Sequence, residues 1–272
     1  MKIFLSFTII LTVLYGCSNN PDPSEKDITG SAQATPVINY AVTKFFPHDI
    51  SLYTEGLLIH NGQLFESTGS PEDRPQTRSV IGIIDLATGK MDKKVEIDQS
   101  KYFGEGIVIL NDKLYQLTYT TQVGFIYDIS SFKQLGQFTY ANKQGWSLTT
   151  NGKELIMSDS TDKLTFLDPD GLKPVKVLAI TENGLPVYRL NELEFIKGFI
   201  FANIWLTDFI VKIDPSSGKV VGRLDLTSLS FEAKNKNPGA DVLNGIAYDA
   251  AADKIYVTGK LWPNIYQLEF AH

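Results

Sequence analysis

Carboxylate and carboxamide side chains recur at the start of similar segments of this sequence. Each opening residue begins a strand-like stretch, and the openings follow one another at intervals of roughly 40 to 50 residues. They are Glu55, Glu105, Gln144, Asn191 and Asn244. If the positions are equivalent, the side chains form a ring. Two carboxylates held close together raise the pKa of at least one, which suits proton transfer, but the ring could instead hold a hard cation such as calcium or simply hydrate a channel.

Aromatic residues and a lysine occupy strand ends expected near the same ring. The aromatic residues are Tyr119, Trp146 and Trp205, and Lys260 ends the stretch VTGK. Trp146 follows Gln144 by two residues, so both face the same side of a strand. These side chains predict an aromatic pocket with one cation, although tryptophans that pack between sheets and a solvated lysine would give the same pattern.

The segments that carry these residues each contain four strand-like stretches separated by turn residues such as Asn-Gly, Asp-Pro and Ser-Gly. Repeats of this length and content are typical of β-propeller blades. The sequence therefore predicts an all-β fold, a five-bladed β-propeller over residues 37–272. The last segment lacks a fourth strand, so we expect the strand from Val37 to Phe46 to complete it and close the ring.

The composition excludes several other functions. The 272 residues include 25 Lys and Arg against 31 Asp and Glu, a net charge of −6 at pH 7. Without a basic stripe, nucleic acid is not an expected partner. One Cys and three scattered His build no zinc motif and no disulfide within the chain.

The N-terminal sequence has the pattern of an export signal. The apolar run from Ile3 to Tyr15 is too short to span a bilayer and fits a signal peptide. It ends in Leu-Tyr-Gly-Cys, which resembles the lipobox of bacterial lipoproteins. We expect a signal peptide over residues 1–16, a lipidated Cys17 and a flexible tether over residues 17–36. The mature protein would then be held on a membrane of the cell envelope, at the periplasmic or outer-membrane face.

Motifs spread over residues 46–263 resemble those of the plant-type glutamine cyclotransferase family, also called glutaminyl-peptide cyclotransferase, which has bacterial members. They occur in order and at blade spacing, and include FPHD from Phe46, YTEGL from Tyr53, FGEG from Phe103, QGWSLTTNG from Gln144, LNELEF from Leu190, ANIWLTD from Ala202 and VTGKLWP from Val257. The resemblance implies a five-bladed propeller that converts N-terminal glutamine of peptides or proteins to pyroglutamate with release of ammonia. It also implies an enzyme that works without zinc. We further expect a monomer that needs no cofactor, although the central channel could hold a structural calcium.

The resemblance also assigns residue roles. The family's acid/base glutamate falls on Glu105, and its reacting-centre amide and lysine fall on Asn191 and Lys260. The substrate-binding set that we predict is Glu55, Tyr119, Gln144, Trp146, Trp205 and Asn244. Two of these residues depart from the family pattern, because Glu55 replaces a glutamine and Tyr119 replaces a third pocket tryptophan.

Two other classes of function remain open from the residues alone. A calcium-dependent propeller hydrolase or lactonase would use the same ring of carboxylates and amides, with calcium in the central channel. A propeller of the cell envelope that only binds a ligand would need the pocket but no proton transfer.

Overall fold

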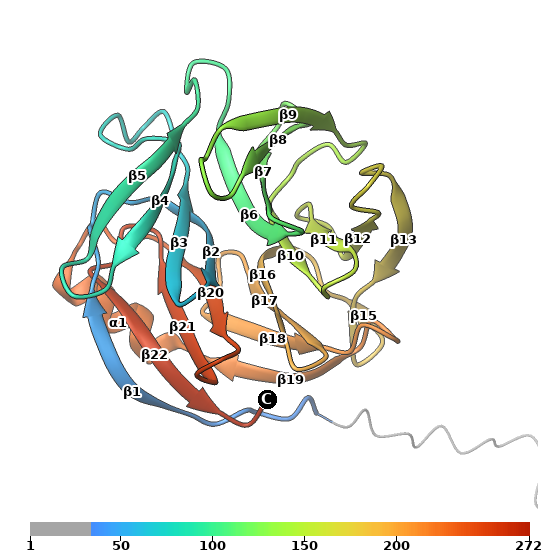
Figure 1. Ribbon diagram of the computed structural model, residues 1–272. Helices are drawn as coiled ribbons and strands as arrows, with labels where there is room; N and C mark the ends of the chain where they lie inside the picture. Colours follow the sequence, from blue (N-terminus) through green and yellow to red (C-terminus); the bar gives the residue numbers. More distant parts are fainter. Residues whose placement is uncertain (1–33) are drawn as a thin grey trace, which may run out of the picture. The chain divides into compact units, whose positions relative to one another are not determined.

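The computed structural model describes residues 34–272. Five four-stranded antiparallel sheets stand around a central axis as the blades of a β-propeller (Figure 1), so the predicted fold class is confirmed. The signal peptide, Cys17 and most of the predicted tether lie outside the described residues. Within residues 34–272 the structure contains no helix that is both long and apolar enough to cross a membrane.

Each of the first four blades is a meander of consecutive strands. The first blade holds β2 (Thr54–His60), β3 (Gln63–Thr68), β4 (Val80–Asp85) and β5 (Lys90–Glu96), and the second holds β6 (Gly104–Leu110), β7 (Lys113–Thr118), β8 (Val123–Asp128) and β9 (Gln134–Thr139). The third holds β10 (Ser147–Thr150), β11 (Leu155–Ser158), β12 (Lys163–Leu167) and β13 (Pro174–Ala179), and the fourth holds β16 (Leu190–Ile196), β17 (Phe199–Ile204), β18 (Phe209–Ile213) and β19 (Val220–Asp225). The last blade combines β20 (Leu243–Asp249), β21 (Lys254–Gly259) and β22 (Asn264–Phe270) with β1 (Tyr40–Pro47).

Two smaller elements were not predicted from the sequence. A short hairpin of β14 (Thr181–Glu182) and β15 (Leu185–Pro186) extends the link from the third blade to the fourth. Helix α1 (Thr227–Lys236) lies between the fourth and fifth blades in sequence, and Leu229 and Ala233 pack it into the hydrophobic core there.

Tight turns set the register of the inner hairpins. Asn61 and Gly62 join β2 to β3 with φ angles of 50° and 72°. A pair of residues with positive φ matches the twist of two-residue hairpins, and asparagine and glycine adopt that conformation at low cost. The inner strand β2 is then buried over most of its length, whereas the outer strand β5 is largely exposed.

The N-terminal strand closes the ring as predicted. Strand β1 runs antiparallel to β22, with Tyr40 opposite Phe270 and Pro47 opposite Asn264. It begins later than Val37, because Val37 forms an isolated bridge with Arg223 of the fourth blade. The chain thus touches the fourth blade before it joins the fifth, and it links the two.

Small residues crowd the propeller axis. A Cβ atom on Gly56 would lie 2.9 Å from the Cα of Gly106, and a Cβ atom on Gly106 would lie 2.4 Å from the Cα of Ser147. The fourth blade places Glu192 in this layer instead. Its carboxylate accepts hydrogen bonds from the backbone N–H groups of Leu57 at 3.2 Å and Ile246 at 2.8 Å. The inner strands are therefore tied across the axis by close backbone contact and by one buried carboxyl group.

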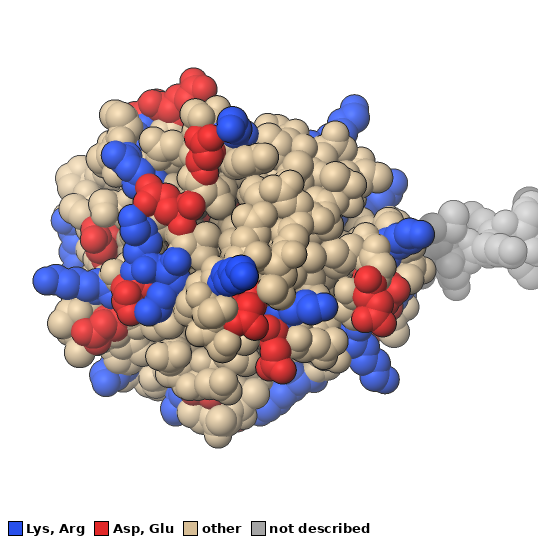
Figure 2. Space-filling model, turned by 45° about the horizontal axis from the view of Figure 1, so that its top comes forward, with Lys and Arg blue, Asp and Glu red and all other residues tan. Residues whose placement is uncertain are grey.

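Charged residues of both signs are interspersed on the face shown in Figure 2, which displays no broad area of Lys and Arg alone. Several charged residues of the described chain form exposed pairs on one strand or one helix, such as Lys93 with Glu96 and Lys236 with Glu232. Exposed pairs of this kind contribute little to stability. They keep the surface hydrated without creating a strong field.

Candidate active site

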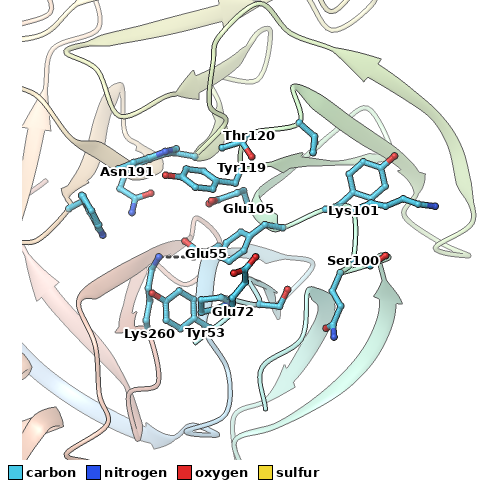
Figure 3. A pocket seen from close by; sticks show the side chains of 18 residues that line it. Tyr53, Glu55, Glu72, Ser100, Lys101, Glu105, Tyr119, Thr120, Asn191 and Lys260 are labelled. Carbon is cyan, nitrogen blue, oxygen red and sulfur yellow. Dashed lines mark hydrogen bonds and ion pairs between the residues drawn. The ribbon is translucent and has the colours of Figure 1, made fainter. Parts of the chain in front are cut away.

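A pocket of about 510 Å³ contains most of the predicted site residues. Figure 3 shows the side chains that line it. From the predicted set, the lining includes Glu55, Glu105, Tyr119, Trp146, Asn191, Trp205 and Lys260. Residues from all five blades therefore meet in one cavity.

An ion pair forms one wall of the inner pocket. Lys260 Nζ lies 2.6 Å from Glu55 Oε1, and the two side chains are only 7% and 2% exposed. Glu55 begins the inner strand of the first blade, and Lys260 follows the second strand of the last blade, so ring closure is what brings them together. Lys260 also lies over the ring of Tyr53, 4.6 Å from its centroid. The positive charge is held between a carboxylate and an aromatic face.

Glu105 is the second carboxyl group of the pocket. Burial raises its pKa well above the ordinary value, and the neighbouring negative charge of Glu55 raises it further. Burial also raises the pKa of Glu55, but the charge and hydrogen bond of Lys260 oppose that rise. The two carboxyl groups line the same pocket, and each shifts the pKa of the other. The pocket therefore favours the protonated form of Glu105 more than that of Glu55, and the two groups influence each other's titration.

Aromatic rings form another wall. The rings of Trp146 and Trp205 meet edge to face, with centroids 5.4 Å apart and planes at 81°. The indole N–H of Trp146 donates to Gln144 Oε1 at 2.9 Å, which fixes the orientation of the ring. Phe103 and Tyr119 form a second tilted pair at 5.9 Å. The cavity is thus shaped to hold a flat or cyclic group away from water.

Asn191 lines the pocket with a buried carboxamide. Its backbone carbonyl accepts a hydrogen bond from the Ser158 hydroxyl at 2.7 Å, so the start of β16 is fixed against the third blade. The side-chain oxygen of Asn191 has no hydrogen-bond partner among the described residues. A buried polar atom without a partner is costly to the protein unless a ligand or water supplies one. Asn191 is therefore available for substrate.

The predicted ring needs one correction. Ser147 pairs with Ser158 as Gly56 pairs with Ser67, so Trp146, rather than Gln144, occupies the position equivalent to Glu55. Gln144 precedes β10 and lies outside the pocket lining. The sequence pattern pointed to Gln144 because Gly145 follows it, just as Gly56 follows Glu55 and Gly106 follows Glu105. Aligning Ser147 with the small residues on the axis would have given the right register.

Asn244 occupies its predicted position but does not line the pocket. It is fully buried, and its amide donates to the backbone oxygen of Thr54 at 2.9 Å and to Glu55 Oε2 at 3.5 Å. Its contribution is to hold the carboxylate of Glu55 in place.

Sequence reasoning missed two pocket residues that stand beside the acidic ones. Tyr53 and Phe103 each precede a site glutamate by two residues and line the same cavity. Side chains two apart on an extended segment face the same side, which is the signal that could have found them. The hydroxyl of Tyr53 donates to Asp241 Oδ2 at 3.3 Å, and burial raises its pKa.

A buried pair supports this wall from behind. His48 Nε2 lies 3.0 Å from Glu66 Oε2, and the other oxygen of Glu66 accepts a hydrogen bond from the Thr54 hydroxyl at 2.7 Å. The remaining nitrogen of His48 lies 2.8 Å from the backbone oxygen of Trp262. The charge of Glu66 raises the pKa of His48 against the effect of burial. This network joins the segment after β1 to the residues on either side of the Glu55–Lys260 pair.

The central channel holds further carboxyl groups. Glu192 accepts two backbone N–H groups, and Glu194 accepts the N–H of Tyr248 at 2.9 Å and the hydroxyl of Thr149 at 3.3 Å. Burial raises the pKa of Glu194 to about 8. Within residues 34–272 no three or more His, Cys, Asp and Glu side chains are grouped in a way that could hold a metal ion. The channel carboxyl groups serve as acceptors between blades.

The fold and the pocket together define a class: a five-bladed β-propeller with a buried acid–base pair and a lysine in an aromatic pocket on its axis. The sequence profile of the glutamine cyclotransferase family matches residues 9–270, and the chain belongs to this family. It is 40% identical over 226 residues to the glutaminyl-peptide cyclotransferase of Arabidopsis thaliana, which covers 82% of this chain and 69% of that protein.

A solved structure agrees with this assignment. The crystal structure of glutaminyl cyclase from Myxococcus xanthus superposes with a TM-score of 0.76 and 32% identity, covering 86% of this chain and 98% of that one. The resemblance seen in the sequence motifs is confirmed.

Proposed function

We propose that this protein is a glutaminyl-peptide cyclotransferase, which converts the N-terminal glutamine of a peptide to pyroglutamate and releases ammonia. The observation that carries the proposal is the buried Glu105 in one pocket with the Glu55–Lys260 ion pair, walled by Trp146 and Trp205. The family membership and the names of the similar proteins from Arabidopsis and Myxococcus support the same reaction.

The reaction needs little more than a folded substrate and a proton relay. The α-amine nitrogen of glutamine attacks its own side-chain amide carbon, a new C–N bond closes the five-membered lactam, and the bond to the amide nitrogen breaks. Holding the two ends of one side chain together supplies much of the rate enhancement. The aromatic rings at 5.4 Å enclose the ring as it forms and keep out the water that would hydrolyse the amide instead.

Glu105 acts as the proton shuttle. It takes a proton from the attacking nitrogen and delivers one to the departing ammonia, so that the proton count is unchanged over the cycle. The Lys260 ammonium, 2.6 Å away, favours the ionised form of Glu55. Lys260 and the Asn191 amide carry N–H donors that can stabilise the negative charge on the amide oxygen.

Ammonia release from the dipeptide Gln-Gln by the purified protein tests the proposal. The product should be a peptide that has lost one ammonia and no longer has a free amine. We expect the activity to persist after treatment with a metal chelator, because Glu105 and Lys260 supply the proton transfer and the charge. A protein that binds the dipeptide but releases no ammonia would contradict the proposed function.

Replacing Glu55 with glutamine should move the acidic limb of the pH–rate profile to lower pH. The negative charge of Glu55 raises the pKa of Glu105, so removing the charge lets Glu105 ionise at lower pH. Lys260, left without its carboxylate, pushes in the same direction. We expect kcat to stay within about tenfold of the parent, since glutamine keeps the size of the side chain and Glu105 remains as the proton shuttle.

The measurement is kcat/KM for Gln-Gln as a function of pH. The exposed Glu269, which lies outside the pocket lining, provides the control variant Glu269→Gln, whose profile should match the parent. A Glu55→Gln profile shifted to higher pH would show that Glu55 does not raise the pKa of Glu105.

We also infer that the enzyme is a lipoprotein of the cell envelope, anchored through Cys17, with residues 18–36 as tether. The short apolar run and the Leu-Tyr-Gly-Cys motif support this inference. Cys17→Ala should abolish acylation, so that the protein leaves the detergent phase in a phase separation. Native protein without an acyl mass on Cys17 would refute it.

A further inference from the structure

We propose that the pocket continues into a subsite for the residues that follow the N-terminal glutamine, and that Glu72 selects a cationic side chain there. We call this part the outer groove and define it by Ser70–Glu72, Gln99–Tyr102, Thr120 and Thr121. The inference rests on the proposed function. It adds the direction in which the peptide leaves the reacting centre and the charge that is preferred along its path.

The lining of the pocket is strongly one-sided. The third, fourth and fifth blades contribute only inner residues, namely Trp146, Asn191, Trp205 and Lys260. Every outer residue comes from the first blade, from the second blade or from the segment that joins them. A cavity of about 510 Å³ falls in the range that encloses a ligand much larger than one glutamine side chain. The rest of a peptide therefore has room on one side, over the first and second blades.

The wall from the first blade is anchored. It is the segment between β3 and β4, in which Arg74 N–H donates to the Pro71 oxygen at 2.9 Å. The Arg74 side chain crosses to the segment between α1 and β20, where it reaches the Gly239 oxygen at 3.5 Å and lies 3.9 Å from Asp241. Glu72 is thus carried by a segment with fixed ends, which favours binding without large rearrangement.

The opposite wall, between β5 and β6, is also held by local contacts. The carboxylate of Asp98 accepts hydrogen bonds from the backbone and hydroxyl of Ser100, and the backbone oxygen of Asp98 accepts the N–H groups of Lys101 and Tyr102. The Tyr102 ring packs edge to face on Phe125 at 5.1 Å. Both sides of the outer groove are therefore formed before a peptide arrives.

The charges of the two walls are not equivalent. Lys101 is paired with Asp98 at 3.2 Å, so its charge is partly neutralised. Among the described residues, no lysine or arginine lies within ion-pair distance of Glu72. In Figure 3 Glu72 points toward the middle of the pocket, whereas Lys101 extends away from it. The outer groove thus presents one free negative charge to the peptide.

A lysine or arginine soon after the glutamine should bind better than an acidic residue. Glu72 is exposed, so the preference should have the size of a surface ion pair, up to about fivefold in kcat/KM. It should act through KM rather than kcat, because Glu72 lies away from the reacting atoms. It should also shrink as the salt concentration rises.

The experiment compares Gln-Lys-Ala with Gln-Glu-Ala, each normalised to glutamine amide, which is too small to reach the outer groove. We expect the parent enzyme to favour the lysine peptide, and Glu72→Lys to reverse the ratio. Asp73→Lys is the matched control, because Asp73 is the next residue on the same segment, is exposed and does not line the pocket. It should leave the ratio at the parent value.

Equal kcat/KM for the two peptides, or a ratio that Glu72→Lys leaves unchanged, would overturn the proposal. An Asp73→Lys variant that changes the ratio of kcat/KM as much as Glu72→Lys does would also overturn it. The preference would then come from the net charge of the segment and not from Glu72. Turnover of glutamine amide separates this failure from a failure of the proposed function. If glutamine amide and both peptides release no ammonia, the reaction itself is wrong, and the subsite falls with it.

Discussion

Replacing Glu105 with glutamine is expected to lower kcat about 100-fold or more. Glutamine keeps the size and polarity of the side chain, but it cannot take up and return a proton, and general acid–base groups contribute about 10² to 10⁴ in rate. The residual activity of the variant should lack the acidic limb that Glu105 gives the parent, because no titrating group is left at this position, so the loss should be largest at the pH values where Glu105 is ionised in the parent. Steady-state ammonia release from Gln-Gln at several pH values measures it.

The stability of the variant provides the control. A neutral side chain in place of a buried carboxyl group with a raised pKa removes no paired charge, so the melting temperature should stay close to that of the parent. A Glu105→Gln enzyme with near-parental kcat, beside an inactive Glu55→Gln enzyme, would reverse the roles assigned to the two carboxyl groups.

Removing strand β1 should leave the last blade without its fourth strand, so that the propeller ring is no longer closed. A chain that starts at residue 48 loses the whole ladder to β22 and the buried Phe46, whose ring packs 6.0 Å from that of Tyr256. Loss of one buried phenylalanine already costs about 3 to 5 kcal/mol, and the exposed edge of β22 invites pairing with other molecules. We expect aggregation, or a melting temperature lower by about 10 °C or more than that of a chain starting at residue 34.

Neighbouring phenylalanines offer a milder version of the same test. Phe46 is 9% exposed and Phe45 is 63% exposed, although both lie on β1. Phe46→Ala should destabilise strongly and Phe45→Ala hardly at all, as followed by thermal unfolding. A monomeric, equally stable chain from residue 48 onward would show that the ring does not depend on β1.

The number and order of the blades were predictable because local patterns specify them. Turns such as Asn61-Gly62 and the alternation within each strand depend on neighbours in sequence, and the repeat supplies the same information five times. Helix α1 gave no comparable signal, because only scattered residues such as Leu229 and Ala233 attach it to the core. The walls of the outer groove were equally hidden, since contacts like that of Arg74 with Gly239 connect distant parts of the chain.

The candidate site was predictable in its residue types but not in its connections. Glu55 and Glu105 could be placed together because they hold equivalent positions in adjacent blades. The pairing of Lys260 with Glu55 joins residues 205 apart, and only the closed ring specifies it. The error at Gln144 arose within the third blade. Both Gly145 and Ser147 are small enough for the position that follows the opening residue, and only the close approach of Ser147 to Gly106 shows that Ser147 occupies it.

The pairing of β1 with β22 also sets the order in which the molecule can fold. Thr43 and Gln267 are partners although they are 224 residues apart, so the first strand of the propeller waits unpaired until the last strand is available. Such a high contact order makes closure a late and slow step, during which both strand edges are open to other chains. β1 carries Lys44 within it and Pro47 at its end, residues that discourage pairing between identical edges. Its sequence thus protects the nascent chain as well as the finished ring.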